Sequence, residues 1–390
     1  MDVRAPTAAS PSTARYPSVR GAPHRPLTLV LVALVAIGLM AAPCFAKPWI
    51  GVRGNQLVDR DGSPVRLLGV NRSGTEYQCE QGSGIFEGPE DEASIAAMAR
   101  WHINAVRVPL NESCWLGINY TKAAFGGTNY RAAIRAYVER LERAGLYVIL
   151  DLHWASPRTY PSAGIIPMPD AEHSPDLWRS VAAEYREDRS VIFDLYNEPR
   201  PGVPWPCWAE GCEIEDNWVG LYQATGMRQL VEAVRSTGAR QPLMLAGVDW
   251  ARNLGGWLAH LPADPADALV ASNHTYDFSL CLAKCRSILL RIARDHPVVT
   301  GEFGEGDCRH RYIDHYMPWA DRHGISYLGW AWDAGNGWTC RGGPSLIKDY
   351  SGHPTGFGIG LREHLRKLAR AKRKPQPAQV LGRRQPPAVS

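Results

Sequence analysis

The feature that most constrains the fold is a regular alternation of short apolar segments with amphipathic segments, which begins at Trp49. The apolar segments have the composition of buried strands and lie at 65–71, 105–110, 147–154, 191–199, 242–250, 268–276, 297–305 and 326–333. Helical patterns between them lie at 92–102, 130–144, 175–188, 218–236, 282–295 and 312–323. Eight such strand–helix units predict an α/β protein with a single (β/α)8 TIM barrel. A doubly wound sheet is the alternative, but the sequence lacks the Gly-rich phosphate-binding turn of that fold.

The segments at the two ends of the barrel are also predictable. Residues 51–66 form a predicted N-terminal β-hairpin with Asp61-Gly62 as its turn, because Asp-Gly is a favoured hairpin turn. A last helix is expected over 358–370, and no Gly/Ser linker leads to a second domain. We therefore assign 47–365 to one domain and 366–390 to a basic, Pro-rich tail that is expected to be disordered.

Residues 1–46 have the pattern of a secretory signal rather than of a folded segment. A basic region with scattered Arg precedes an apolar run over 27–42, and the small residue Ala46 provides a cleavage position. The run is shorter than the roughly 20 residues of a membrane-spanning helix, although an uncleaved anchor is the alternative. We therefore expect a protein secreted to the periplasm or the extracellular space, with no integral membrane domain after cleavage, and association with the cell surface is the alternative.

The net charge of +4 is unevenly distributed along the chain. Residues 1–46 carry +3 and residues 362–390 carry +8, which leaves −7 for the body between them. A nucleic-acid-binding domain would concentrate positive charge on its folded surface. The charge distribution therefore argues against a nucleic-acid partner. Separately, we expect the protein to be a monomer.

The cysteine count agrees with export. Of nine cysteines, cleavage would remove Cys44 and leave an even number, which favours disulfides in an exported chain. Near neighbours in the sequence predict four pairs: Cys79–Cys114, Cys207–Cys212, Cys281–Cys285 and Cys308–Cys340. A zinc site is the alternative, but the two closest pairs lack the C-x-x-C spacing that zinc sites favour.

Polar residues interrupt the apolar strands near their C-terminal ends, which is where the working residues of such barrels lie. These positions include Arg107, Asp151 and His153, Asn197 and Glu198, His274 and Tyr276, and Glu302. Burying such groups is costly unless they pair with one another, so a convergent site is favoured. Alternating Asp151 and His153 could suggest a metal site, which would require more His or carboxylate ligands at comparable strand ends. The remaining strand-end histidine, His274, lies in an Asn-His-Thr-Tyr context that suits hydroxyl recognition better.

Two of these strand ends carry a glutamate, about three strand–helix units apart, so Glu198 and Glu302 are expected to face each other across the barrel mouth. Glycosidic hydrolysis requires paired carboxylates, one as proton donor and one as nucleophile or base. Each has a structural alternative, since Glu198 could cap a turn and Glu302 could pair with Arg107. Glu305 is a weaker rival nucleophile because it lies past the strand end.

Asn197-Glu198-Pro199 after an apolar strand, together with Gly301-Glu302-Phe303-Gly304 at the end of a later one, resembles the glycoside hydrolase family 5 cellulases. The resemblance runs from the Asp61-Gly62 turn to about residue 365. It implies that Glu198 is the acid/base and Glu302 the nucleophile of a retaining double displacement.

The resemblance also implies roles for the surrounding polar residues. Arg107 and Tyr276 would keep the nucleophile ionised, Asn197 would bind the sugar 2-hydroxyl, and His153 and His274 would orient hydroxyls and neighbouring side chains.

Tryptophan provides the expected sugar platform, because flat aromatic rings stack on the apolar faces of a pyranose. By the resemblance Trp332 takes this role, although Trp330 points the same way along a strand and leaves the choice open. Further tryptophans in or beside the predicted loops are Trp115, Trp154, Trp205, Trp208, Trp250 and Trp338. We expect about half of them to line a cleft and the others to belong to the core.

These features together predict a secreted retaining β-glycosidase that needs neither a metal nor an organic cofactor. Its expected substrate is a β-linked polysaccharide or oligosaccharide, with endo-β-1,4-glucanase (cellulase) activity favoured. A β-mannanase, a β-1,3-glucanase and a glycolipid-cleaving enzyme are alternatives, because their active-site cores look alike. A non-catalytic carbohydrate-binding barrel is the alternative from another class, but a pure binding protein needs neither Glu198 nor Glu302.

Overall fold

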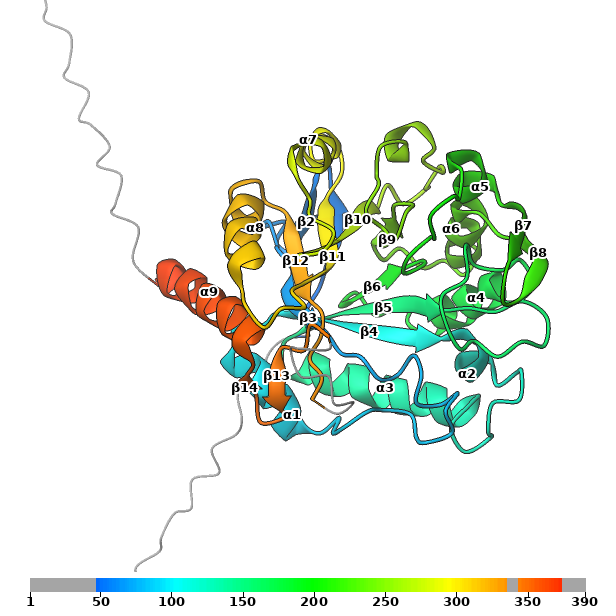
Figure 1. The fold of residues 1–390 in the computed structure, drawn as a ribbon, viewed down its shortest axis with the longest axis horizontal. Helices are drawn as coiled ribbons and strands as arrows, with labels where there is room; N and C mark the ends of the chain where they lie inside the picture. The colour runs from blue at the N-terminus through cyan, green and yellow to red at the C-terminus, as the bar shows by residue number, and fades with distance from the viewer. Residues whose placement is uncertain (1–46, 335–342, 374–390) are drawn as a thin grey trace, which may run out of the picture. The chain divides into compact units, whose positions relative to one another are not determined.

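The computed structural model describes residues 47–334 and 343–373. The predicted signal segment, Trp338, Cys340 and the predicted tail beyond residue 373 lie outside these ranges. Within them, parallel strands form the predicted closed barrel (Figure 1). Its strands are β3 (Leu68–Asn71), β4 (Ala105–Asn111), β5 (Tyr147–Trp154), β6 (Val191–Asp194), β9 (Leu243–Ala246), β10 (Leu269–Tyr276), β11 (Val298–Gly304) and β12 (Ser326–Gly329). All eight predicted strands are present, but β6, β9 and β12 end four or five residues before the predicted ends.

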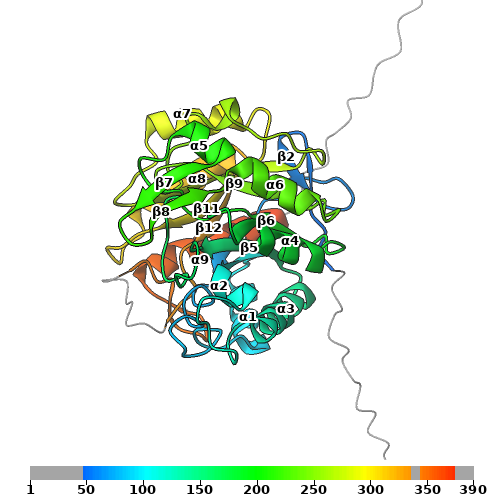
Figure 2. The ribbon, with the colours of Figure 1, turned by 90° about the vertical axis from the view of Figure 1, so that its right-hand side faces the viewer.

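Helices surround the barrel on the outside (Figure 2). The longer ones are α1 (Glu92–Arg100), α3 (Thr128–Arg143), α4 (Ser174–Glu184), α6 (Met227–Arg235), α7 (Ala283–Ile292), α8 (Arg311–Arg322) and α9 (Gly356–Arg373), and the short α2 (Glu112–Leu116) and α5 (Trp205–Glu210) lie in loops. In α6 the buried side chains Met227, Leu230, Val231 and Val234 recur with helical spacing and so face the core. No helix in the described ranges is long and apolar enough to cross a membrane.

The helix predicted over 218–236 is only partly present. The first half of the helix predicted over 218–236 is a strand, β8 (Gly220–Ala224), which pairs with β7 (Cys212–Asp216) as an antiparallel hairpin. The helical pattern is genuine only from Met227, because Gly226 interrupts it and caps the helix that follows.

The N-terminal hairpin exists but turns earlier than predicted. It consists of β1 (Gly51–Arg53) and β2 (Gln56–Val58), so Gly54-Asn55 forms the turn, with Gly54 at a φ of 58°. Asp61-Gly62 instead closes a second turn, in which the Gly62 N–H donates to the Asp59 carbonyl oxygen at 2.9 Å. A further hairpin, β13 (Ile347–Asp349) with β14 (His353–Pro354), lies between β12 and α9.

The interior of the barrel changes from apolar to polar along its axis. At one level it is filled by a buried apolar cluster that includes Ile149, Met244, Val270 and Leu328. Leu57 from β2 and Ile50, which directly precedes β1, belong to the same cluster. Farther along the strands the interior is polar and contains fully buried Arg107. The polar side chains therefore rest on a packed apolar layer.

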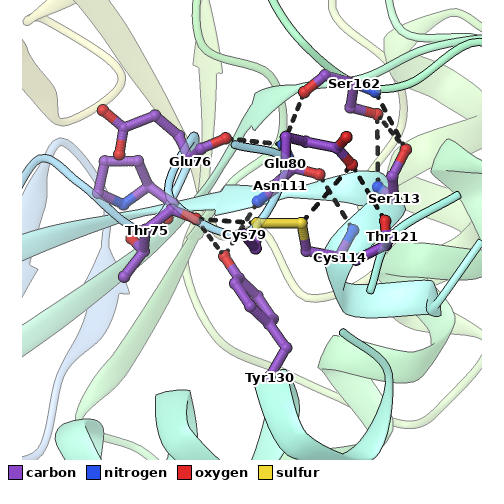
Figure 3. The surroundings of a disulfide bond; sticks show 11 residues. Thr75, Glu76, Cys79, Glu80, Asn111, Ser113, Cys114, Thr121, Tyr130 and Ser162 are labelled. Carbon is purple, nitrogen blue, oxygen red and sulfur yellow. Dashed lines mark hydrogen bonds between the residues drawn. A yellow bond between two sulfur atoms is a disulfide. The ribbon is translucent and has the colours of Figure 1, made fainter. Parts of the chain in front are cut away.

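Three of the four predicted disulfides are present, and the fourth, Cys308–Cys340, includes a residue outside the described ranges. Cys79–Cys114 ties the loop after β3 to α2 (Figure 3). Beside it Asn111 donates from Nδ2 to the carbonyl oxygens of Glu76 and Ser162, both at 2.7 Å. The bond therefore joins two loops that already share buried hydrogen bonds.

We predict that the double substitution Cys79→Ala/Cys114→Ala lowers the free energy of unfolding by about 3–4 kcal/mol, because the bond closes a long loop in the unfolded chain. Cys207→Ala/Cys212→Ala is the matched control, since its residues are only 5 apart instead of 35. By the same loop-closure argument, this control should lower the free energy of unfolding by about 2 kcal/mol. Urea unfolding monitored by Trp fluorescence measures both, and equal losses would contradict the chain-entropy explanation.

Candidate active site

Glu302, near the end of β11, is held by two donors. Arg107 Nη1 donates to its Oε1 at 2.8 Å, and the Tyr276 hydroxyl donates to its Oε2 at 2.5 Å. Arg107 is fully buried and Glu302 is 4% exposed. Charge-assisted hydrogen bonds at low exposure favour the ionised form of a carboxyl group. Glu302 is therefore arranged as a fixed carboxylate.

Arg107 is the centre of a larger buried network. Its Nε donates to Asp194 at 3.0 Å, and its Nη2 lies 2.9 Å from both Asp151 Oδ1 and Asn197 Oδ1. Burial alone would lower the pKa of Arg107, but the adjacent carboxylates raise it. Burial raises the pKa of Asp194, although the adjacent Arg107 opposes this shift. The guanidinium is thus locked in one orientation.

Asp194 and Asn71 belong to this network but were missed as site residues from the sequence. Asn71 accepts from Arg107 Nη1 at 3.0 Å and donates from Nδ2 to the Gly301 carbonyl oxygen at 3.0 Å. Each ends its strand, and each is a fully buried polar residue. That position, a polar residue after an apolar run, was the available signal.

Glu198, in the loop after β6, faces Glu302. His274 Nδ1 lies 2.9 Å from Glu198 Oε1 and 3.5 Å from Glu302 Oε2. A carboxylate oxygen of Glu198, one of Glu302 and an imidazole nitrogen of His274 all lie within 4.8 Å of one another. Carboxyl groups about 5–5.5 Å apart suit direct attack on a sugar, whereas about 6.5–9.5 Å would leave room for an intervening water.

The environments of the two glutamates differ in a way that suits different protonation states. Burial raises the pKa of Glu198 to about 7, although the nearby His153 and Arg107 oppose this shift. Glu198 receives no hydrogen bond from Arg107, whereas both oxygens of Glu302 are bound by strong donors. One carboxyl group is therefore disposed to carry a proton and the other to remain charged.

The two predicted histidines also lie at the site. His153 Nδ1 is 2.6 Å from Asp151 Oδ2, and its Nε2 is 3.3 Å from Asn197 Nδ2. Burial would lower the pKa of His153, but the Asp151 carboxylate raises it. Burial lowers the pKa of His274 to about 4, so its ring is neutral at pH 7 and forms a neutral hydrogen bond with Glu198.

Glu198, His274 and Glu302 are close enough to offer ligand atoms to one metal ion. However, both oxygens of Glu302 already accept hydrogen bonds, and the Arg107 charge adjoins one of them. A cation at this point would be repelled by the guanidinium. The donor set therefore suits carboxylate chemistry better than metal binding.

A cavity of about 440 Å³ opens above this constellation. Its lining residues include His153, Asn197, Glu198, Trp250, Arg252, His274, Tyr276, Phe278, Glu302 and Trp330. An adjoining cavity of about 170 Å³ shares His153, Trp330 and Pro344 with it and adds Glu76, Tyr77 and Trp154. The arrangement is an extended cleft with two glutamates in its wall.

The prediction that Trp332 is the sugar platform is wrong. Trp332 is fully buried and packs edge-on against Trp101 at 5.0 Å between ring centroids, so neither face can meet a ligand. Trp330 lines both cavities instead and stacks on His153 at 5.2 Å and 11°. The side chains of Trp330 and Trp332 point to different places because β12 ends at Gly329. Beyond that residue, positions two apart no longer face the same side as they do in a strand.

The remaining candidates divide between cleft and core. Trp250 and Trp154 line cavities, whereas Trp115 and Trp208 are fully buried in the core. The rival Glu305 accepts the Ile313 N–H at 2.9 Å and does not line the cavity, so it holds the loop before α8.

The similarity to known proteins agrees with this geometry. A family model described as Cellulase (glycosyl hydrolase family 5) matches residues 58–336. A mannan endo-1,4-beta-mannosidase from Streptomyces lividans is 24% identical over 82% of this chain and 77% of its own length. Endoglucanase B from Acetivibrio thermocellus is 31% identical, but only over 39% of this chain and 29% of its own length.

Solved structures show the same fold. A beta-glucanase from Saccharophagus degradans, crystallised with cellotetraose, has a TM-score of 0.62 at 18% identity and covers 83% of this chain and 94% of its own. The catalytic domain of the major endoglucanase from Xanthomonas campestris pv. campestris has a TM-score of 0.61 at 20% identity, over 81% and 99% of the two chains.

Proposed function

Because this chain belongs to glycosyl hydrolase family 5, we propose that it cleaves β-1,4-linked glucan by a retaining double displacement. The supporting observation is the pair of carboxyl groups in the cleft: Glu302 bound by Arg107 and Tyr276, and Glu198 free of such charge pairing. One carboxylate oxygen of each lies within 4.8 Å of the other, and such a close approach suits a retaining enzyme, whose carboxyl groups stand about 5–5.5 Å apart.

In the first step of the proposed mechanism, Glu302 attacks the anomeric carbon and the bond to the leaving oxygen breaks. Glu198 gives its proton to that oxygen, so the leaving group departs as an alcohol. Forming the covalent sugar ester removes the Glu302 charge, which lowers the pKa of Glu198. Glu198 then removes a proton from water, and the water oxygen attacks the anomeric carbon. The bond to Glu302 breaks, and the second inversion restores the original configuration of the anomeric carbon.

The residues around the pair position the sugar and the two glutamates. Arg107 and Tyr276 keep Glu302 ionised and aimed at the anomeric carbon. Asn197, oriented by Arg107 and His153, is placed to bind the sugar 2-hydroxyl, where contacts strengthen in the transition state. His274 orients Glu198 through its 2.9 Å contact.

The choice of glucan over mannan rests on the relatives, among which endoglucanases from several bacteria stand beside mannanases. A panel hydrolysis tests it: wild-type protein is incubated with carboxymethylcellulose, β-mannan, laminarin and xylan, and new reducing ends are counted. Release from carboxymethylcellulose above all others supports the proposal. Preferential release from β-mannan would replace the glucan by mannan and leave the mechanism unchanged.

Trp330 is proposed as the platform beneath the sugar that is attacked. Trp330→Ala should lower kcat/KM on cello-oligosaccharides about 10–100-fold, because a stacking surface is lost while the fold is kept. Trp332→Ala is the contrasting variant, which should lower the free energy of unfolding by about 3–5 kcal/mol through a core cavity. Kinetics and thermal unfolding of both variants separate the roles, and the opposite pattern would restore Trp332 as the platform.

The pH profile should report the proton on Glu198. Its pKa is raised to about 7, so the acid form that protonates the leaving group is present below pH 7 and is lost above it. We therefore expect kcat/KM on cello-oligosaccharides to fall about tenfold per pH unit above that value. The dinitrophenolate of a dinitrophenyl cellobioside leaves without protonation, so the fall in kcat/KM above pH 7 should be absent for this substrate. The same fall with both substrates would contradict the assignment of the proton to Glu198.

Secretion is the remaining part of the proposal. It is supported by the signal-like residues 1–46 and by disulfides in the folded domain, which are typical of exported proteins. Intact mass measurement of the secreted protein should give a chain that starts at Lys47. A chain that retains 27–42 in a membrane fraction would instead indicate an anchor.

A further inference from the structure

Two carboxyl groups that the proposed mechanism does not use are buried together outside the catalytic cavity. Glu112 is the first residue of α2 and Asp170 lies in the loop before α4, and both are fully buried. The Ser174 hydroxyl contacts one oxygen of each group, and a hydrogen bond joins the two groups directly. We refer to Glu112 and Asp170 as the carboxyl pair.

The donors around the carboxyl pair are backbone N–H groups. Glu112 Oε1 accepts the Ser156 N–H at 2.9 Å, and Asp170 Oδ1 accepts the N–H groups of Glu172 and His173 at 2.9 and 2.8 Å. Within the described ranges, no lysine or arginine forms an ion pair with either group. Two adjacent carboxylates in a buried site cannot both remain charged without a cation, and a hydrogen bond between them requires a proton. The carboxyl pair therefore shares one proton.

Burial and charge act in the same direction on Glu112. Burial raises its pKa well above the ordinary value, and the charge of Asp170 raises it further. Burial also raises the pKa of Asp170, although the hydrogen bond from Glu112 opposes this shift. The proton is therefore retained at pH values at which an exposed carboxyl group would have lost it.

Three further titratable side chains face the carboxyl pair. His173 Nδ1 lies 3.5 Å from Asp170 Oδ1 and 3.1 Å from the Ser156 carbonyl oxygen. Tyr196, just after β6, and Tyr222, in β8, face it from the other side, and burial raises the pKa of both. The two tyrosines therefore stay neutral near pH 7 and add no charge to the pair.

The loop that carries Asp170 also holds the segment that carries Glu198. The Tyr196 hydroxyl donates to the Ile166 carbonyl oxygen at 2.7 Å. The Arg200 N–H donates to the Pro167 carbonyl oxygen at 3.0 Å. These two hydrogen bonds are made by the residues two before and two after Glu198 in the chain. A displacement of the loop would therefore be transmitted to the catalytic acid from both sides.

We propose that Glu112 and Asp170 are positioning residues, whose shared proton holds residues 165–170 in place and thereby orients Glu198 toward the leaving oxygen. This inference rests on the proposed function, in which Glu198 protonates that oxygen. Loss of the shared proton would leave two negative charges in contact, and their repulsion would displace the loop. Glu302 is held by a separate set of donors, so its attack on the sugar should be little affected.

The test compares two substrates that differ in their need for Glu198. Cello-oligosaccharides require its proton, whereas a dinitrophenyl cellobioside does not. Glu112→Ala removes one half of the carboxyl pair and the acceptor of the Ser156 N–H. It should lower kcat/KM on cello-oligosaccharides about 10–100-fold more than on the dinitrophenyl cellobioside, because the acid is misplaced. A merely structural role would leave the ratio of the two values unchanged, and that result would overturn the inference.

Glu112→Gln is the conservative variant that should restore the ratio. Its amide N–H can donate to Asp170 in place of the shared proton, and its amide oxygen can still accept the Ser156 N–H. The ratio should therefore lie within a few-fold of the wild-type value. A loss as large as that in Glu112→Ala would overturn the role assigned to the hydrogen bond within the pair.

Glu142 provides the matched control. It forms a second buried carboxyl pair with Asp188, which Ser190 bridges, but this pair contacts Lys47 and lies beside the N-terminal end of β6. Glu142→Ala should lower stability without changing the substrate ratio. A change in the ratio equal to that in Glu112→Ala would overturn the positioning role.

The pH dependence of stability tests the shared proton even if Glu112→Ala fails to fold. The folded protein keeps a proton that Glu112 loses in the unfolded chain above its ordinary pKa of 4.5, so stability falls as pH rises. Between about pH 5 and 7, the unfolding equilibrium constant of the wild type should rise by up to tenfold per pH unit relative to that of Glu112→Gln. Urea unfolding measures both, and equal pH dependences would overturn the shared proton.

A cation is the alternative to the proton, since Glu112, Asp170 and His173 offer ligand atoms within 4.8 Å of one another. Unfolding is therefore repeated with Ca²⁺, with Mn²⁺ and with a chelator. The inference expects equal stability in all three conditions. Stabilisation of the wild type by either ion, absent from Glu112→Gln, would replace the shared proton by a metal site.

The activity of the wild type distinguishes failure of this inference from failure of the proposed function. Cleavage of both cello-configured substrates, with the same ratio in wild type and Glu112→Ala, would contradict the inference alone. Absence of cleavage of both by the wild type would contradict the glucanase proposal, and the positioning role would fail with it.

Discussion

Replacement of Glu302 by Gln is expected to lower kcat/KM on every cleavable β-glycoside by about 10⁴–10⁶-fold, because an amide cannot form the glycosyl ester. The substitution preserves the shape of the side chain. The amide oxygen can still accept from Arg107, and the Tyr276 hydroxyl can rotate to accept from the amide N–H. The fold should therefore persist, and circular dichroism and thermal unfolding check that it does.

Glu305→Gln is the matched control for this prediction. Glu305 lies three residues later, but its carboxylate accepts the Ile313 N–H outside the cavity. Its substitution should change kcat/KM only a few-fold. An inactive Glu305→Gln protein together with an active Glu302→Gln protein would exchange the two assignments.

The second large effect is expected from Glu198→Ala. Removal of the proton donor should lower kcat/KM on cello-oligosaccharides by about 10³–10⁴-fold, since the leaving oxygen must depart unprotonated. The loss should be much smaller for a dinitrophenyl cellobioside, whose phenolate leaves without help. Turnover of that substrate should then be limited by hydrolysis of the glycosyl-enzyme, because Glu198 no longer activates water.

Azide can replace the missing base, and the configuration of its product identifies each glutamate. In Glu198→Ala, azide should accelerate turnover of the dinitrophenyl cellobioside and yield the β-azide, since Glu302 still forms the intermediate and two inversions occur. In Glu302→Ala, direct attack by azide should yield the α-azide by a single inversion. NMR of the products distinguishes the two anomers, and the reverse outcome would exchange the roles of Glu198 and Glu302.

The two catalytic carboxyl groups contribute differently to the stability of the folded protein. The pKa of Glu198 is raised from its ordinary value to about 7, so its ionisation in the folded state is unfavourable and stability falls as pH rises between these values. Glu302, by contrast, offsets the positive charge of Arg107 at 2.8 Å. The first group is tuned for proton transfer at a cost in stability, whereas the second is part of the packed interior.

The barrel was predictable because each of its strands and helices can be identified from the residue pattern of a short segment. An apolar run such as 147–154 or 268–276 must be buried on both faces, and helical spacing in 130–144 and 312–323 identifies the elements that cover it. Glu198 and Glu302 were predictable for the same reason, since Glu302 lies near the end of an apolar strand and Glu198 follows one closely. The predicted disulfide pairs within the described ranges could also be read from sequence proximity.

Other features depend on how distant segments meet. Nothing in the sequence around Asp194 indicates that it binds Arg107 from a strand 87 residues away, because that contact exists only once the barrel closes. The β7–β8 hairpin replaces half of a predicted helix since Cys212 and Ala224 become cross-strand neighbours, which local helical spacing does not reveal.

The sequence by itself determined the order of the barrel strands and of the main helices, the positions of the glutamates and the family, because each depends on residue type and spacing along the chain. Tertiary structure alone decided which ring of Trp330 and Trp332 faces the cleft, since the chain leaves strand geometry after Gly329. It also decided that Phe278, in the loop after β10, lines the catalytic cavity. The physical reason is that burial and electrostatic coupling depend on distances in space, which closure of the barrel sets for all strands at once.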